Sequence, residues 1–497
     1  MHKDRYPCLL IILAGVLVFW PVIGFEFLKY DDTINVSKNS HLLFPSGHSL
    51  IYFWRHFFLD LYIPVTYTVW LGLAALSSEV FGRLDAGLFH LANMLIHILS
   101  ALLVYELVQR LYRIREGAGH DPAAGRWPAL LAGLVFCLHP LQVESVCWIT
   151  GFKDVLGGFL GLLATRLYLA TVQPEGYRLP RYGLATVVFM LAVLAKPSAV
   201  AVPLMIFFMV LWTRRQKVVT IIQYLLPWLI LAAVIILLTR AAQPAGSAGL
   251  TDYPWLIRPM IALDAFFFYV YKLIWPAIML IDYGRTPARV LQLGWGNPFW
   301  LMAPVLAGLL YLAENRRRWL LVAAIFAAGL LPVSGLLPFA FQRTSTVADR
   351  YVYLAMMAAG LAAAELVYGR QQRLIFGLCL VLVLAWGVKS SYQCRLWHNT
   401  GRIMEYTLRY NPDSFRANLN YGIALADRAE FARALSYYQK ARRLRPDDPV
   451  PRFNLGVAYA GLGRTALWRQ QYEYLENRDP AKAERLARAA ARFEALR

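Results

Sequence analysis

Long uncharged runs, separated by clusters of basic residues, are the main pattern along this chain. The first run, residues 8–25, carries no charge over 18 positions, and a helix of that length can cross the hydrocarbon core of a bilayer. Reading from one basic cluster to the next predicts eleven such helices. They are expected at 8–25, 88–110, 127–145, 152–172, 182–196, 197–213, 218–239, 298–313, 319–336, 351–368 and 374–392. The pattern therefore predicts an all-α, polytopic membrane domain over residues 1–395.

The basic clusters also predict the orientation of these helices. Lys and Arg are enriched in cytoplasmic loops, which places the N-terminus and the clusters in the cytoplasm. The clusters are Arg110/Arg113/Arg115/Arg126, Arg178/Arg181, Arg214/Arg215/Lys217, Arg316/Arg317/Arg318 and Arg370/Arg373. Lys3 and Arg5 precede a first run that has no small-x-small cleavage site, so we expect a retained signal anchor. Eleven crossings leave the C-terminus on the external side.

Two places depart from a series of simple crossings. Residues 260–281 are apolar enough to span, but a crossing there would move Arg316/Arg317/Arg318 to the wrong side. An interfacial or re-entrant helix is therefore expected, since partial helices at membrane depth are tolerated where they line a protein cavity. The two runs that meet at Lys196 are short, and short helices often shape a wet cavity within the bilayer.

The predicted external segment 26–87 is the longest between spans. It contains amphipathic pieces at 51–61 and 65–76 that are rich in Trp, Tyr and Phe, and such aromatics suit helices at the membrane interface. A spanning helix at 63–81 is the alternative, and it would invert every downstream segment. The positive residues favour the interfacial interpretation.

A 34-residue period follows the last run. Gly422 recurs as Gly456, and Pro412 recurs as Pro446 and Pro480. The first full repeat carries Tyr421, Gly422, Leu425, Ala434, Tyr438, Ala441 and Pro446 at the spacing of a tetratricopeptide helix pair. Residues 396–497 are thus predicted to form a tetratricopeptide α-solenoid. Its groove could hold an extended peptide, or the array could dock on the membrane domain or on a second copy, and both alternatives stay open.

Composition supports a membrane protein. Hydrophobic residues make up 59% of the chain and charged residues 16%, against about 45–50% and 25% in soluble domains. The net charge is +20, and residues 389–497 hold 20 Lys/Arg against 11 Asp/Glu, which favours anionic lipid headgroups or acidic partners. No nucleic-acid partner is expected. The five cysteines are odd in number and match no metal spacing, so we interpret them as buried thiols.

The candidate chemistry begins at Asp31 and Asp32, which follow the first span on the external side. A solvated turn or a helix cap is the simple interpretation of such a pair. Glu144 and Asp154 are expected to approach the same surface from other segments, together with Lys153. Convergent ionisable groups at the rim of a membrane domain indicate a site for a polar or phosphorylated substrate.

Other polar residues lie inside or next to the apolar runs. His90, Asn93 and His97 share one face of the second span, where a hydrogen-bonded polar stripe is favoured over a metal site. Lys196 needs a carboxylate or a phosphate as partner. Arg343 and Arg350 could clamp a phosphate, or they could neutralise Asp349 and lipid headgroups. The chain has no Walker loop, GxSxG or CxxC motif, so an activated substrate would have to supply the energy of any reaction.

Taken in order, these residues resemble the C-type (GT-C) glycosyltransferase superfamily, and most closely its transmembrane-and-tetratricopeptide protein O-mannosyltransferases with their bacterial relatives. The matching stretches are Phe27-Leu28-Lys29-Tyr30-Asp31-Asp32, Tyr62-Ile63-Pro64-Val65-Thr66, Phe89-His90-Leu91-Ala92-Asn93 with His97, His139-Pro140 with Glu144, Gly151-Phe152-Lys153-Asp154, Leu194-Ala195-Lys196-Pro197, and Asp349-Arg350-Tyr351 with Tyr353-Leu354. The superfamily usually shows Gly-Arg before the later aspartate, Lys-Glu at the short-helix junction, and Glu-Arg with a following Leu-Pro. The departures here are Gly151-Phe152-Lys153, Lys196-Pro197, and Asp349-Arg350 with Leu354-Ala355.

The resemblance implies transfer of one sugar from a polyprenyl-phosphate carrier to a protein hydroxyl on the external, periplasmic face of a bacterial inner membrane. Asp31 would be the general base, with Asp32 as its orienter or substitute. Glu144, Asp154 and His90 would bind the acceptor or a metal. Lys153, Lys196, Arg343, Arg350 and Tyr353 would bind the donor phosphate.

Some members of the superfamily use a metal, and a divalent cation (Mg²⁺ or Mn²⁺) on Asp31, Glu144 and Asp154 is one alternative. The other partners implied are membrane lipids and a protein or peptide acceptor, which the repeats could present. The competing functions are sugar transfer to a lipid or glycan, and a non-catalytic membrane-anchored repeat scaffold or transporter.

Overall fold

The computed structural model describes residues 5–117, 122–173, 176–177, 179–214, 216–242, 253–368 and 373–495. Of the residues behind the topology prediction, Lys3, Arg178, Arg215 and Arg370 lie outside these ranges. The chain divides into two compact units. The first consists of Met1–Glu26, Ile34–Met279 and Arg285–Arg395, and the second of Phe27–Thr33, Leu280–Gly284 and Leu396–Arg497.

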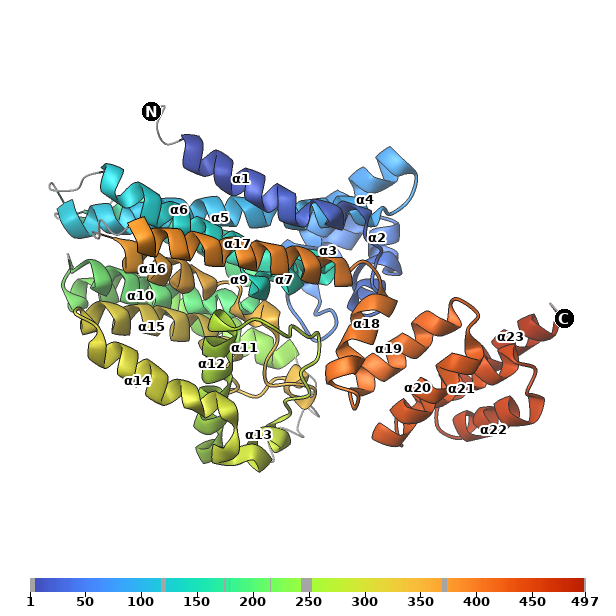
Figure 1. The fold of residues 1–497 in the computed structure, drawn as a ribbon. Helices are drawn as coiled ribbons and strands as arrows, with labels where there is room; N and C mark the ends of the chain where they lie inside the picture. The colour runs from blue at the N-terminus through green and yellow to red at the C-terminus, as the bar shows by residue number, and fades with distance from the viewer. Residues whose placement is uncertain are drawn as a thin grey trace. The chain divides into compact units, whose positions relative to one another are not determined.

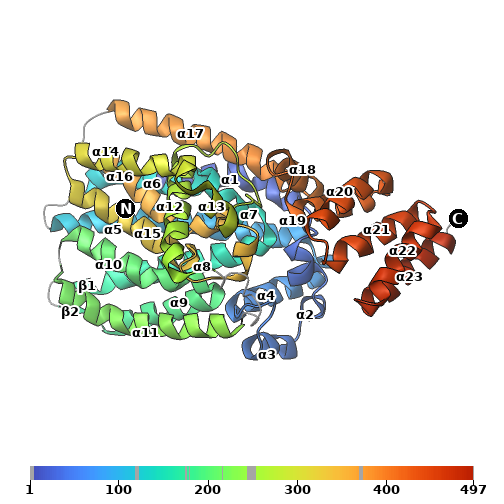
Figure 2. The same cartoon turned by 90° about the horizontal axis from the view of Figure 1, so that it is seen from below.

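The first unit is built around α5 (Ala86–Glu116) and α6 (Pro122–Leu138), which pack against each other. α8 (Phe152–Thr171) also packs on α5, and α1 (Arg5–Phe19) and α16 (Met356–Val367) pack on α6. Farther along the chain, α10 (Val202–Thr213) lies beside α15 (Arg316–Leu330), as Figure 1 shows. α9 (Leu179–Ala195) lies between α8 and α11 (Val218–Ala242), which Figure 2 shows from below. These uncharged runs form helices because a helix satisfies its own backbone polar groups in an apolar medium.

The other elements up to residue 396 are mostly short. In chain order they are η2 (Trp20–Gly24), η3 (Thr33–Ser37), α2 (Ser40–Leu43), α3 (Gly47–Arg55), α4 (Pro64–Phe81), η5 (Pro140–Gln142), α7 (Val143–Cys147), η6 (Ile149–Gly151), β1 (Val172–Gln173), β2 (Gly176–Tyr177), η7 (Pro197–Ala201), η9 (Trp255–Ile257), α12 (Arg258–Ile274), α13 (Pro287–Leu293), η10 (Gly294–Gly296), η11 (Pro298–Leu301), α14 (Met302–Leu312), η12 (Leu331–Val333), η13 (Ala340–Arg343), η14 (Asp349–Val352) and α17 (Arg373–Leu396). The two strands form one antiparallel pair. The fold is therefore all-helical apart from this small hairpin, as predicted.

Within the described ranges, four helices are long and apolar enough to cross a membrane: Tyr6–Gly24, Ala86–Glu116, Val218–Ala242 and Leu374–Leu396. Two bent pairs raise the number to six, namely Gly125–Leu138 with Pro140–Cys147 and Pro287–Leu293 with Pro298–Leu312. Only 22% of the apolar window of α11 and 17% of that of α17 is buried. Such exposed apolar surface needs an apolar surrounding. The protein is an integral membrane protein, and the count of eleven spans stays a prediction.

Several sequence expectations can be compared with individual helices. The piece expected at 51–61 is helical only to Arg55, because the chain then turns through Leu59 and Asp60, both with positive φ. The prediction of a helix through residue 61 was therefore wrong. Residues 65–76 lie inside α4, which is not among the long apolar helices. The expected helix at 260–281 is α12, which ends at Ile274, and its re-entrant character stays a prediction.

The second unit contains a series of helices in which each packs on the next. They are α18 (Thr400–Tyr410), α19 (Phe415–Ala426), α20 (Phe431–Leu444), α21 (Pro449–Gly461), α22 (Thr465–Glu476) and α23 (Pro480–Ala495). α21 begins 34 residues after α19, and α22 begins 34 residues after α20. The helix pairs thus repeat with the period of the sequence. Assignment of this array to the tetratricopeptide class stays a prediction. The division into a membrane domain at 1–395 and a repeat domain at 396–497 stays a prediction as well.

Candidate functional site

Glu144 and Arg350 form a buried ion pair in the first unit. Glu144 lies in α7 and Arg350 in η14. The Arg350 guanidinium donates to Glu144 Oε1, and the Arg350 backbone N–H donates to Glu144 Oε2 at 3.2 Å. The guanidinium also lies over the rings of Phe341 and Tyr351, at 4.4 and 4.9 Å. A buried charge is stable only with such partners, so the pair fixes η14 against α7.

Asp154 and Lys196 form a second pair. Asp154 is in the first turn of α8, and Lys196 separates α9 from η7, with Nζ 3.0 Å from Asp154 Oδ1. Lys196 is extended because residues before proline avoid the helical conformation. Its backbone can lie against α8 because residue 157 is glycine, where an added Cβ would come within 2.5 Å of Lys196 Cβ. Of the two partners expected for Lys196, the structure provides the carboxylate.

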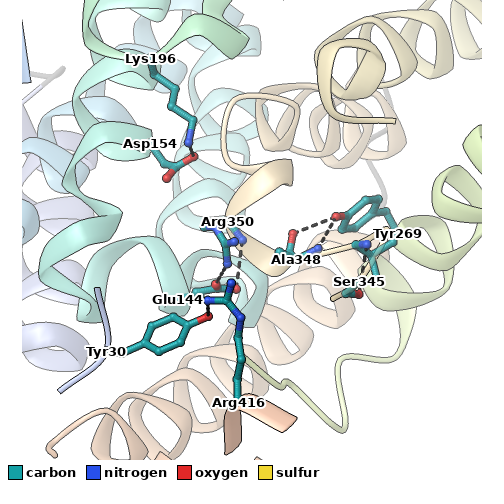
Figure 3. Close-up of polar contacts among 10 residues, drawn as sticks. Tyr30, Glu144, Asp154, Lys196, Tyr269, Ser345, Ala348, Arg350 and Arg416 are labelled. Atoms are coloured by element: carbon teal, nitrogen blue, oxygen red, sulfur yellow. Dashed lines mark hydrogen bonds and ion pairs between the residues drawn. The ribbon is translucent and has the colours of Figure 1, made fainter. Parts of the chain in front are cut away.

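The two pairs belong to one polar assembly. Figure 3 shows Arg350 with Glu144 and, in the same region, Lys196 with Asp154. The Asp154 and Glu144 carboxylates are close enough for their charges to interact. Segments around residues 144, 154, 196 and 350 thus lie near one another, whereas the predicted convergence also included Asp31. Their functional roles stay predictions.

Tyr353 is buried beside this assembly, and its hydroxyl is occupied. It lies 3.0 Å from His97 Nδ1, and His97 Nε2 lies 3.0 Å from the carbonyl oxygen of Cys137. Because a carbonyl only accepts, Nε2 carries the proton and Nδ1 accepts from the Tyr353 hydroxyl. Gly158 leaves space for the Tyr353 ring, since an added Cβ would lie 2.5 Å from it. Tyr353 thus contacts α5 and α8 just before α16 begins, and its role in binding the donor phosphate stays a prediction.

The stripe on α5 is bonded to backbone carbonyls. Asn93 Nδ2 donates to Ser145 at 3.4 Å, to Val146 at 3.2 Å and to Trp148 at 2.8 Å. His90 is fully buried and meets the Phe25 ring edge-on at 5.9 Å. Within the described ranges, no group of three His, Cys, Asp or Glu side chains is placed to hold a metal ion. Asn93 and His97 are hydrogen-bonded, as a polar stripe requires, and the roles of His90, Asn93 and His97 stay predictions.

The remaining predicted cations differ in exposure. Lys153 is buried, with Nζ 5.7 Å from the Trp148 ring centre. Arg343 ends η13 and has an exposed side chain, whereas Arg350 is buried and paired with Glu144. A phosphate clamp built from Arg343 and Arg350 stays a prediction. Arg350 pairs with Glu144, and neutralisation of Asp349 or of lipid headgroups by Arg343 and Arg350 stays a prediction.

Asp31 and Asp32 belong to the second unit. Asp32 is fully buried and its Oδ2 accepts the Leu28 N–H at 2.9 Å, so it shapes the turn that carries the pair. Asp31 is partly exposed. The convergence of Asp31 with Glu144 and Asp154 stays a prediction.

Contacts to the C-terminal helices hold this acidic segment. The Lys29 backbone N–H donates to Thr400 Oγ1 at 2.7 Å, and Lys29 Nζ lies 2.5 Å from Asp427 Oδ2. Arg416 Nη1 donates to the Tyr30 hydroxyl at 2.8 Å. Tyr30, and more weakly Asp31, raise the pKa of Arg416, so both groups interact favourably with the guanidinium charge. Arg416 carries no recognisable signal in the sequence, because nothing local marks one arginine of a basic repeat as the partner of a distant loop.

Further polar residues of the first unit were missed. The Tyr269 hydroxyl donates to the carbonyl of Ala348 at 2.8 Å and accepts its N–H at 3.0 Å, which fixes the start of η14 (Figure 3). Thr66 Oγ1 donates to the carbonyl oxygen of Ala195 at 2.9 Å. Ala195 is the last residue of α9, directly before Lys196. Asp264 is buried and bonded to Arg285 and Asn297. A carboxylate inside the apolar run 260–281 was the signal that could have identified this last group.

Several buried polar atoms near the ion pairs have no hydrogen-bond partner among the described residues. They are Asp154 Oδ2, both side-chain polar atoms of Gln142, Ser145 Oγ and Thr346 Oγ1. Buried polar groups are normally bonded to protein, water or a ligand. These atoms flank Glu144 and Arg350 in the sequence or belong to Asp154 itself. That a polar substrate is their partner stays a prediction.

Comparison with known proteins gives a consistent result. No family model matches the chain. It is 22% identical over 430 residues to Protein O-mannosyl-transferase TMTC3 of Homo sapiens, which covers 77% of this chain and 45% of that protein. It is 29% identical over 168 residues to Protein O-mannosyl-transferase tmtc2 of Xenopus laevis, covering 33% of this chain and 19% of that protein. The chain therefore spans less than half the length of these relatives.

Among solved structures, the archaeal oligosaccharyltransferase AglB from Archaeoglobus fulgidus superposes with a TM-score of 0.40 and 13% identity, over 82% of this chain and 56% of that one. The sequence relatives confirm the resemblance to the C-type glycosyltransferase superfamily. Within it, the similarity is to the transmembrane-and-tetratricopeptide protein O-mannosyltransferases.

Proposed function

We propose that this protein is a membrane glycosyltransferase that moves one sugar from a polyprenyl-phosphate donor to a protein hydroxyl on the external face of the membrane. The similarity to protein O-mannosyl-transferases over 77% of the chain supports this proposal. The buried assembly of Glu144, Arg350, Asp154 and Lys196 is the observation that carries it. Because buried pairs contribute little net stability by themselves, a buried assembly that leaves one Asp154 oxygen without a partner among the described residues favours a binding role.

The assembly suits a phosphorylated substrate. Asp154 uses Oδ1 for Lys196, while Oδ2 has no partner among the described residues. A phosphate oxygen could share Lys196 by a charge-assisted hydrogen bond, and a sugar hydroxyl could donate to Asp154 Oδ2. Cations already held in place would stabilise the charge that develops on the departing phosphate.

In the proposed reaction the acceptor oxygen attacks the anomeric carbon, and the bond from that carbon to the donor phosphate oxygen breaks. Asp31 takes the acceptor proton as general base, and the polyprenyl phosphate leaves as an anion. Asp32 is bonded to the Leu28 N–H, so it keeps the shape of the turn that presents Asp31. A divalent cation on Asp31, Glu144 and Asp154 fits poorly, because Arg350 occupies both Glu144 oxygens and Lys196 one Asp154 oxygen.

For the C-terminal helices of the second unit we propose a role in bracing two loops, Phe27–Thr33 and Leu280–Gly284. Segments Phe27–Thr33 and Leu280–Gly284 are parts of this unit. Besides the contacts of Lys29 and Tyr30, Asp282 Oδ2 accepts from Ser414 Oγ at 2.6 Å, and Asn411 Nδ2 donates to the Asp282 carbonyl at 3.2 Å. These contacts support bracing, and presentation of an acceptor peptide in a tetratricopeptide groove is the alternative. A periplasmic location of this unit, at a bacterial inner membrane, is part of the proposal.

Purified protein given a labelled polyprenyl-phosphate sugar and a panel of protein, lipid and glycan acceptors tests the function. Asp31→Asn should lower transfer by about 10²–10⁴-fold, because an amide cannot take the proton. Asp60→Asn is the matched control: Asp60 is an exposed loop aspartate with positive φ, a conformation that asparagine tolerates. Sugar transfer only to a lipid or a glycan would show that the acceptor is not a protein. No use of the donor by wild-type protein with any acceptor would favour a scaffold or transporter.

Deletion of residues 413–497 separates the two roles of the C-terminal unit. If this unit only recruits large acceptors, transfer to a short peptide should survive the deletion. If it braces the Asp31 segment, transfer to short peptides should fall as well.

A further inference from the structure

Two of the five cysteines lie next to each other. Cys147 Sγ and Cys394 Sγ are 2.9 Å apart although 247 residues separate them, and both side chains are fully buried. Cys137 is also buried, whereas Cys8 and Cys379 are half-buried. The expectation of five buried thiols therefore holds for three of them. No metal ligand accompanies the pair among the described residues, so the adjacency needs another explanation.

The position of Cys394 is fixed by its own helix. Trp386, Ser390 and Gln393 recur on one face of α17 at helical spacing. The Trp386 ring meets the His139 ring at 4.4 Å, Ser390 Oγ donates to the Leu138 carbonyl at 2.7 Å, and Gln393 Nε2 donates to the Met279 carbonyl at 2.9 Å. These contacts set both the rotation and the height of the last turns of α17.

The position of Cys147 is fixed independently. Asn93 of α5 donates to the carbonyls of Val146 and Trp148, the two neighbours of Cys147. The Trp148 N–H in turn bonds to the Glu144 carbonyl at 3.3 Å. Each thiol is thus held by its own set of hydrogen bonds, and neither position depends on a contact between the two sulfur atoms.

We propose that Cys147 and Cys394 are a disulfide site. One thiolate attacks the disulfide of a protein thiol oxidant, and the second thiolate then displaces the oxidant from the mixed disulfide. The two cysteines lose two protons and two electrons, and the oxidant disulfide is reduced to two thiols. The bond forms before the two helices finish packing, since both sulfur atoms are later inaccessible.

The compartment is consistent with this chemistry. The proposed topology places Glu144 and the end of α17 at the external side, and disulfides persist in oxidising compartments such as the periplasm. This step rests on the topology in the proposed function, whereas the pairing itself rests on the contacts above. The cross-link would tie the end of α17 to α7, three residues from Glu144. Its role would be to keep the segment that carries Glu144 in place.

The test is mass spectrometry of alkylated thiols. Membranes from cells with a periplasmic thiol oxidant are treated with an alkylating agent in strong denaturant, without and then with reductant. We expect Cys8, Cys137 and Cys379 to be labelled at once, and Cys147 and Cys394 only after reduction. In Cys147→Ser protein, Cys394 should be labelled without reductant, whereas Cys379→Ser should leave the pair protected.

Labelling of all five thiols in wild-type protein without reductant would overturn the proposal, because the denaturant removes protection by burial. Cells that lack the thiol oxidant should yield five labelled thiols. Protection of the pair in such cells would overturn the oxidation route. The readout needs no sugar donor, so its failure is distinct from failure of the proposed enzymatic activity.

Discussion

The two ion pairs of the buried assembly in the first unit differ in their surroundings from the Lys29–Asp427 pair of the second unit. In the first unit, the side chains of Arg350 and Glu144 are 8% and 2% exposed, and those of Lys196 and Asp154 are 15% and 3% exposed. In the second unit, Lys29 and Asp427 are 52% and 43% exposed. Exposed pairs contribute little because water screens them, whereas a buried pair leaves a costly charge when one partner is removed. Loss of one partner should therefore cost much more stability in the buried pairs of the first unit than in the exposed Lys29–Asp427 pair of the second.

The largest effect is expected for Glu144→Gln. It leaves the Arg350 guanidinium buried without its anion, which should destabilise the protein by about 3–5 kcal/mol. Denaturant unfolding in detergent micelles measures the change. The double variant Glu144→Gln/Arg350→Gln should recover part of the loss, because no unpaired charge is left. A double variant as unstable as the sum of the two single variants would show that the pair is not coupled.

Lys196→Met is expected to have the next largest effect. Methionine keeps most of the side-chain volume but removes the partner of Asp154, at a cost of about 3 kcal/mol. Lys440→Met is the matched control, since Lys440 pairs with Asp413 at 2.9 Å with both side chains substantially exposed. The control should change the free energy of unfolding by no more than about 0.5 kcal/mol. Equal effects at the two sites would remove the contrast between the units.

Gly157→Ala tests how the backbone positions the buried pair. The added Cβ would come within 2.5 Å of Lys196 Cβ, so helix α8 would have to shift at a cost of about 1–3 kcal/mol. Gly183→Ala in α9 is the control, because nothing lies within 4 Å of its added Cβ. It should be neutral or stabilising by about 0.5–1 kcal/mol. Thermal unfolding of both variants in the same detergent gives the comparison.

The smallest effect is expected for Lys29→Ala in the second unit. Its pair with Asp427 is solvent-exposed, so the loss should be about 0–1 kcal/mol and should shrink in high salt. Hydrogen exchange of residues 27–33 is the sensitive readout. Arg416→Ala should increase exchange in this segment more, since Arg416 bonds the Tyr30 hydroxyl and covers its ring at 5.4 Å. Equal exchange in both variants would argue against bracing by Arg416.

Much of the fold could be predicted because its signals are local. A helix in lipid is specified by an uncharged run of sufficient length, and the runs at 88–110, 152–172 and 218–239 lie within or close to α5, α8 and α11. The break at Lys196 was also predictable, because Pro197 restricts the residue before it. The piece at 51–61 failed because an amphipathic pattern does not exclude a turn, and Leu59 and Asp60 adopt positive φ there.

The candidate site was only partly predictable. Glu144, Asp154, Lys196 and Arg350 were identified as charged groups that need partners in or near a membrane, but the sequence could not pair them. Charges alone suggested Asp349, its neighbour, as a partner of Arg350 and gave no sign of the contact with Glu144 that the structure shows. Tyr269 and Thr66 were missed, since a hydroxyl in an apolar helix has no local signal for the carbonyl it will meet.

By itself the sequence determined the membrane character, the helical class and the 34-residue period, because each is set by the chemistry of residues close together in the chain. Tertiary structure decided which charges neutralise one another, which turn carries Asp31 and which two thiols meet. Glu144 and Arg350 lie 206 residues apart, and Cys147 and Cys394 lie 247 residues apart. Contacts over such separations depend on how whole helices pack. The free energy of that packing is shared by many side chains, so no single residue in the sequence indicates which partner it will contact.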